Sequence, residues 1–219
     1  MKEDILEQLV EDWLVAKIGW FVKHNVKFRP SKNHPKYNPN KDSVHSDIDI
    51  LAFSNREKGI QRVAVVTCKS WQGGFNAKKW KEDLEVEPEY NERREGFQPR
   101  ERWKYFREIT SDKWIEAFVD KIEEETGQRD FEYYIVVTKL KGRVEDKVHL
   151  QNSKVIVNRF KKYKSNVNIK IITLEEIIND YYSRIKGKDT PSLEATDVGR
   201  LLQLIHAADL QIKETGHGA

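Results

Sequence analysis

Two acidic residues and one lysine occur on two consecutive apolar segments of this sequence. Asp47 and Asp49 begin the first segment, and Lys69 ends the second. Turn-forming residues 55–59 separate the segments, which predicts two strands joined as a hairpin. Because side chains two residues apart on a strand point to the same face, both carboxylates would share one face. Carboxylates next to an ammonium group suit the hydrolysis of a phosphodiester with a divalent metal ion.

Each of these residues also has a purely structural interpretation. Carboxylates at the end of a strand are often solvated, and a lysine there can extend its ammonium group into water. The run from Val63 to Val66 is apolar on both faces and predicts a buried strand. A lysine that ends such a strand favours the interpretation as a site.

The spacing of apolar residues predicts the elements around this hairpin. A first helix is expected to end or break at Gly19, and an acidic insertion follows the second helix. The further helices are expected at 75–84, 100–109, 111–125 with Ser111 as N-cap, 146–163, 174–185 behind a Thr173–Glu176 capping box, and 196–208, and the further strands at 26–28, 131–138 and 167–172.

This order predicts an α/β fold with a mixed central sheet flanked by helices. We expect one domain over residues 1–186, with a helical insertion at about 85–127. Residues 187–219 would form a linker, a C-terminal helix and a tail.

The charged residues are unevenly distributed. Lysine and arginine total 39 against 36 aspartates and glutamates, so the net charge of +3 indicates no partner class. Residues 23–41 and 154–170, however, contain several basic residues and no acid. Such stretches can either contact a polyanion or form solvated surface.

The single cysteine and the N-terminal residues bear on location. Cys68 has no partner in the chain, which excludes an intramolecular disulfide and argues against a cysteine zinc site. The first residues contain several acids, and no apolar run approaches the length of a membrane span. We therefore expect a cytoplasmic protein without membrane contact.

Three short motifs follow one another in the first part of the chain. Glu7 precedes Gly19 by twelve residues, and the triplets Asp47-Ile48-Asp49 and Thr67-Cys68-Lys69 follow. In order and spacing these motifs resemble the PD-(D/E)XK nuclease superfamily, and more closely its junction-resolvase and Mrr-type restriction branch. The resemblance covers residues 5–84 in motif, and its specificity lies in order and context.

The resemblance implies a restriction-endonuclease-like core, which contains a helix, an antiparallel three-stranded meander, a helix and a further strand. It implies a Mg²⁺ or Mn²⁺ ion bound by Asp49, the backbone carbonyl of Cys68 and Glu7. Lys69 would orient the attacking water or stabilise charge on the phosphate. The implied activity is that of a metal-dependent DNA endonuclease.

Thr67 stands where the family pattern has an acid, and a hydroxyl is a weaker Mg²⁺ ligand than a carboxylate. Three explanations remain open. Glu82, thirteen residues after Lys69, could return a carboxylate to this place; or Asp47, Asp49 and Glu7 could suffice. Alternatively, the protein is a catalytically impaired nucleic-acid-binding or complex-forming subunit.

Other residues are candidates for contacts with DNA or with a partner protein. A homodimer would suit an enzyme that cuts both strands, and the C-terminal helix could pack on a partner or on its own core. The candidates for DNA contact are Lys27, Arg29, Lys32 and Lys36 in the first basic stretch, with Trp71 and Gln72 just beyond Lys69.

Overall fold

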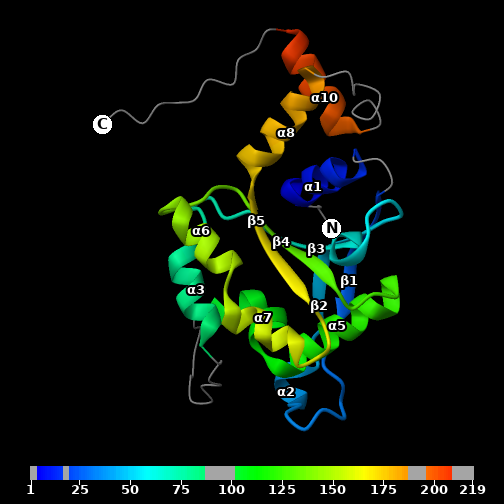
Figure 1. Cartoon of the computed structure of the whole chain (residues 1–219), viewed down its shortest axis with the longest axis vertical. Helices are drawn as coiled ribbons and strands as arrows, with labels where there is room; N and C mark the ends of the chain where they lie inside the picture. The colour runs from blue at the N-terminus through cyan, green and yellow to red at the C-terminus, as the bar shows by residue number, and fades with distance from the viewer. Residues whose placement is uncertain (1–3, 17–19, 87–101, 187–195, 209–219) are drawn as a thin grey trace.

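A five-stranded mixed sheet forms the centre of the protein (Figure 1). The computed structural model describes residues 4–16, 20–86, 102–186 and 196–208. The strands β1 to β5 are adjacent in sequence order; β1, β2 and β3 are antiparallel, while β3, β4 and β5 are parallel. Their bounds are Trp20–Phe28, Ser46–Ser54, Val63–Lys69, Phe131–Val137 and Val167–Thr173. The predicted α/β fold with a mixed sheet is therefore confirmed.

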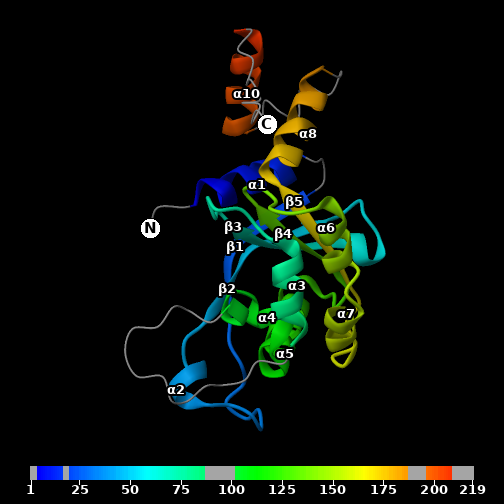
Figure 2. The same cartoon turned by 90° about the vertical axis from the view of Figure 1, so that its left-hand side faces the viewer.

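Helices cover both faces of this sheet (Figures 1 and 2). On one face lie α1 (Ile5–Val15) and α8 (Leu174–Lys186), and α10 (Asp197–Ala207) packs against these two helices. The other face carries α3 (Ala77–Glu85), α4 (Arg107–Thr110), α5 (Asp112–Thr126), α6 (Val144–Gln151) and α7 (Lys154–Lys161). The short helix α2 (Pro39–Asp42) lies between β1 and β2, and the 3₁₀ helices η1 (Gly59–Arg62) and η2 (Arg102–Phe106) precede β3 and α4.

The strand β3 shows why the sheet is buried on both sides. Val63 and Val65 belong to the core beneath α5, whereas Ala64 and Val66 belong to the core beneath α1. Alternate side chains on a strand point to opposite faces, so a continuous apolar run serves two cores. Among the described residues, no helix is long and apolar enough to span a bilayer.

Several predicted boundaries are confirmed. The helix expected at 75–84 is α3, the last expected helix is α10, and α10 packs against α1 and α8 of its own chain. The Thr173–Glu176 capping box is present, with Glu176 N–H donating to the Thr173 hydroxyl at 3.1 Å and Thr173 N–H to the Glu176 carboxylate at 2.7 Å. Of the helical insertion expected at about 85–127, residues 87–101 lie outside the described residues, and α5 within it contributes to the main core.

Other boundaries differ from the sequence-based expectation. The strand β1 begins at Trp20, not Val26, because pairing with β2 runs from Trp20 opposite Ser54 onward. The helix expected at 146–163 is divided into α6 and α7, since the Ser153 hydroxyl caps a new helix by accepting from Ile156 N–H at 3.3 Å. The region expected as a helix over 100–109 is η2 followed by α4.

The cap expected from Ser111 is also only partly present. Ser111 occupies the N-cap position of α5, but its side chain makes no cap hydrogen bond. Its backbone carbonyl instead accepts the N–H groups of Trp114 and Ile115, both at 2.9 Å.

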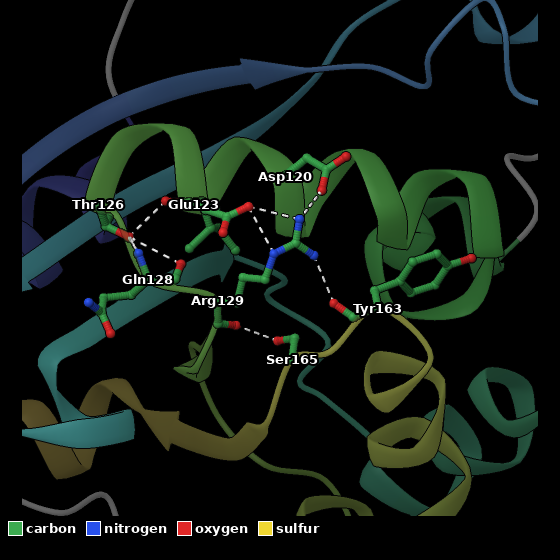
Figure 3. A network of polar contacts seen from close by, with 8 residues as sticks. Asp120, Glu123, Thr126, Gln128, Arg129, Tyr163 and Ser165 are labelled. Atoms are coloured by element: carbon green, nitrogen blue, oxygen red, sulfur yellow. Dashed lines mark hydrogen bonds and ion pairs between the residues drawn. The ribbon is translucent and has the colours of Figure 1, made fainter.

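Arg129 joins the end of α5 to the parallel part of the sheet (Figure 3). Its guanidinium group donates to Glu123 at 2.8 Å, to Asp120 at 2.7 Å and to the Tyr163 carbonyl at 2.8 Å. The Ser165 hydroxyl donates to the Arg129 carbonyl. These bonds hold α5, the start of β4 and the turn before β5 together.

A buried ion pair anchors the long connection between β1 and β2. Lys113 Nζ on α5 lies 2.5 Å from Asp42 Oδ2, and both side chains are at most 3% exposed. The same ammonium group donates to the Lys36 carbonyl at 3.1 Å, and Asp42 accepts from Asn38 N–H at 2.7 Å. The loop that carries much of the first basic stretch is thus fixed to the main core.

We predict that Asp42→Asn or Lys113→Met lowers the free energy of unfolding by about 3 kcal/mol, because either change removes one charge of a buried ion pair. Urea denaturation followed by circular dichroism measures the loss. Lys162→Met is the control: Lys162 lies 3.5 Å from Asp112 at the surface, where an ion pair contributes about 1 kcal/mol or less. Equal losses in all three variants would contradict the prediction.

Candidate functional site

Asp49, Thr67 and Lys69 converge where β3 ends. Asp49 Oδ2 accepts the backbone N–H of Cys68 at 2.6 Å and the Thr67 hydroxyl at 3.2 Å. Lys69 Nζ donates to Thr67 Oγ1 at 2.7 Å. The antiparallel pairing of β2 and β3, in which Ile50 lies opposite Val66, produces this meeting.

The Asp49 carboxyl group is largely withdrawn from water. Burial raises its pKa, and the Asp47 charge raises it further, whereas Lys69 and the Cys68 N–H lower it. The net direction is upward from the ordinary value. A negative charge is therefore costly here, and an additional cation would stabilise it.

Helix α1 brings a second acid to this end of the sheet. Asp4 caps α1 by accepting Leu6 N–H at 2.8 Å, and its other oxygen accepts the Ser70 hydroxyl at 2.7 Å. The first turn of α1 is thereby tied to the residue that follows Lys69. Glu7 lies in that turn, half-buried and within electrostatic range of Asp49.

The protonation of Glu7 reflects a local excess of negative charge. Burial is the largest cause that raises the pKa of Glu7, followed by the charges of Asp49, Asp4 and Asp47, while His24 lowers it. The result is a pKa of about 7. Four carboxyl groups thus share a region with few compensating cations.

The remaining candidates for the missing acid lie differently. Asp47 is exposed on β2 and acts on Glu7 and Asp49 through its charge. Glu82 is exposed on α3, and within the described ranges no hydrogen bond or ion pair joins it to Asp49 or Lys69. The return of the Glu82 carboxylate to the Thr67 position stays a prediction without a contact that supports it.

Two buried residues next to Thr67 were not identified from the sequence. The Tyr133 hydroxyl on β4 donates to Glu108 Oε1 on α4 at 2.6 Å, and its oxygen is an alternative acceptor for the Thr67 hydroxyl proton. Glu108 follows a segment of poor periodicity, so no spacing links it to Lys69. Its position between the core residues Phe106 and Ile109 was the available signal.

Trp71 packs within a group of aromatic rings. Its indole stacks on Trp80 with a centroid distance of 5.1 Å and on Phe75 at 6.2 Å. Gln72, the next residue, is exposed. Contact of either residue with a DNA base stays a prediction.

The candidate DNA-binding cations lie on a surface of mixed charge. Lys27, Arg29, Lys32 and Lys36 are all exposed. Lys27 and Arg29 line a hollow of about 780 Å³ that also contains Glu116, Asp120 and Glu124 from α5. The acidic side chains of α5 partly offset the charges of Lys27 and Arg29. Lys32 lies on the loop and does not line this hollow.

The donors around Asp49 suit a hard divalent cation. Among the residues that the structure describes, no three His, Cys, Asp or Glu side chains form a ready-made metal group. Mg²⁺, however, is commonly held by one or two carboxylates and keeps several waters. Asp49 and Glu7 supply that type of donor, and the mutual repulsion that raises the pKa of Glu7 would be relieved by a cation.

We predict that Glu7 makes stability fall as pH rises from about 4.5 to about 7. The folded protein holds this proton more tightly than the unfolded chain does, so Glu7 favours folding at acid pH and loses this effect through its folded pKa. Glu7→Gln should remove this part of the pH dependence, which amounts to about 1 kcal/mol in the free energy of unfolding once solvent screening is allowed for. Urea midpoints across this pH range measure it, and an unchanged slope would contradict it.

No family model, no curated protein and no solved structure matched this chain in three separate comparisons.

Proposed function

We propose that this chain is a restriction-endonuclease-like enzyme that hydrolyses phosphodiester bonds in DNA with Mg²⁺ or Mn²⁺. The observation that carries the proposal is the contact of Asp49 with Thr67 and of Thr67 with Lys69, with Glu7 within electrostatic range. A carboxylate, a hydroxyl and an ammonium group thus meet at the end of two adjoining interior strands, β2 and β3.

The order of elements supports the fold assignment. An α-helix precedes three antiparallel strands, and the helices α3, α4 and α5 lie between these strands and the parallel strand β4. This is the order that the resemblance implies. The candidate site lies where β2 and β3 meet the start of α1, so its residues come from three rigid elements.

The side chains divide the proposed task by charge. Lys69 is placed to stabilise negative charge that develops on a phosphate, and its ammonium group is oriented by Thr67. Asp49 and Glu7, with the Cys68 carbonyl, would hold the ion. When bound, the ion lowers the pKa of a water and offsets phosphate charge.

A second candidate is a protein that binds nucleic acid, or joins a complex, without cleavage. Thr67 favours it, because its neutral hydroxyl leaves the site one carboxylate short. Two apolar side chains on α10 favour the formation of a complex, because Leu201 and Leu204 are 56% and 68% exposed and could pack against a partner.

Plasmid nicking separates the two candidates. We predict cleavage that requires Mg²⁺ or Mn²⁺ and that falls about 100-fold or more in Asp49→Ala and in Lys69→Ala, because each change removes a group that stabilises transition-state charge. Agarose gels of supercoiled substrate measure the rate. Thermal melting shows whether each variant is folded.

Glu82→Ala is the matched control on α3. Unchanged cleavage in this variant identifies Glu82 as a surface acid. Activity that survives both Asp49→Ala and Lys69→Ala would overturn the site assignment. No cleavage of linear, supercoiled or branched DNA would favour the second candidate.

DNA binding itself provides the next prediction. Lys32→Ala with Lys36→Ala should weaken binding of every DNA sequence similarly and reduce the slope of log K against log[salt] by about 1 to 2, since each phosphate contact contributes about 0.9. Fluorescence anisotropy in Ca²⁺ at several salt concentrations measures both. Lys58→Ala is the control, because Lys58 is exposed in the β2–β3 turn, at the opposite end of β2 from this loop. An unchanged slope in the double variant would contradict contact at this loop.

A further inference from the structure

Glu108 is a buried acid that neither motif nor spacing connects to the candidate site. Its side chain is 8% exposed and lies on α4 within the core beneath α5. Buried carboxylates are costly unless hydrogen bonds or a cation compensate them. The residues that compensate Glu108 therefore indicate what it does.

Two hydroxyl groups lie between Glu108 and the centre of the site. Tyr133 donates its proton to Glu108 Oε1 at 2.6 Å. Thr67 accepts from Lys69 at 2.7 Å, and its single proton has two alternative acceptors, Asp49 Oδ2 at 3.2 Å and the Tyr133 oxygen. Tyr133 and Thr67 thus place the acid on α4 next to the group that Lys69 binds.

Lys69 extends toward α4 as well. Its ammonium nitrogen lies 5.3 Å from the centre of the Phe106 ring, two residues before Glu108 in the chain. Burial raises the pKa of Glu108 above its ordinary value overall; the charge of Lys69 is the largest influence that lowers it, followed by the Tyr133 hydrogen bond. Lys69 thus lies within electrostatic range of the carboxyl groups of both Asp49 and Glu108.

We propose that Glu108 is a positioning residue of the candidate site, which supplies from α4 the negative charge that Thr67 lacks and holds Lys69 next to Asp49. Its effect on cleavage rests on the proposed function; its coupling to Lys69 does not. An ammonium group attracted by two carboxylates has fewer favourable orientations than one that faces a hydroxyl alone. Thr67, which accepts from Lys69 and donates to Asp49, carries this restraint to Asp49.

The chain contains a matched control for a purely structural buried acid. Glu132, 4% exposed, accepts from the Tyr134 hydroxyl and lies 2.7 Å from Lys170. It has the same tyrosine–glutamate–lysine composition as the Glu108 group, but within the described part of the chain no hydrogen bond or ion pair joins it to Asp49 or Thr67. Glu132→Gln therefore reproduces the loss of a buried charge without the proposed role.

The first experiment needs no enzymatic activity. Melting temperatures are measured at pH 8 for Lys69→Met, Glu108→Gln and the double variant. Lys69→Met should lower the melting temperature by about 3 °C less in the Glu108→Gln background than in the wild type, because the unpaired buried carboxylate is absent. With Glu132→Gln in place of Glu108→Gln, the losses should add.

The second experiment uses cleavage and a rescue. Glu108→Gln should lower kcat about 10-fold with KM for DNA changed less than about twofold, because substrate contacts remain. Thr67→Glu in that background restores the charge beside Lys69 and should recover kcat to within about threefold of the wild type. Thr67→Glu should not improve Glu132→Gln.

The outcomes are distinguishable. Additive losses for Lys69 and Glu108 would overturn the inference, whether or not the protein cleaves DNA. Coupled losses with no cleavage of any DNA would sustain the Glu108–Lys69 interaction and refute the proposed function. Coupled losses with cleavage but no rescue by Thr67→Glu would overturn the claim that Glu108 replaces a charge at position 67.

Discussion

The candidate site depends on the hydrogen bonds that the Asp49 carboxylate, on β2, accepts from the end of β3. The carboxylate accepts the Cys68 N–H, two residues beyond the pair of Ile50 with Val66, and thereby holds the end of β3 against β2. A buried carboxylate requires such donors, and Thr67 provides a second one. The orientation of Lys69 follows from these bonds, because its ammonium group donates to the same hydroxyl.

Much of this arrangement was accessible from the sequence, since it depends on local patterns. The turn residues between two apolar runs predicted the hairpin, and the two-residue spacing predicted which acids share a face. The capping box at Thr173 and Glu176 was equally local. Boundaries decided by pairing were less accessible: Trp20 belongs to β1 because β2 provides a partner, although its surroundings have helical spacing.

The residues that sequence patterns could not provide are those that meet across distant elements. Glu108 reaches Thr67 only because β4 inserts Tyr133 between them, and parallel pairing of β3 with β4 fixes that position. A separation of 41 residues between Thr67 and Glu108 carries no periodicity. Glu82, by contrast, satisfied a sequence spacing and lies exposed on α3. Spacing along the chain indicates a shared site only within one element or between paired neighbours.

The buried pair of Lys113 and Asp42 bears on how the protein would meet a large anion. A flexible loop loses conformational entropy when a partner orders it, and that loss weakens binding. The β1–β2 loop is already ordered in the free protein by a charge pair beneath its surface and by the Lys36 carbonyl. Lys32 and Lys36 are therefore preorganised on a fixed backbone, and an encounter with a phosphate chain needs to order only their side chains.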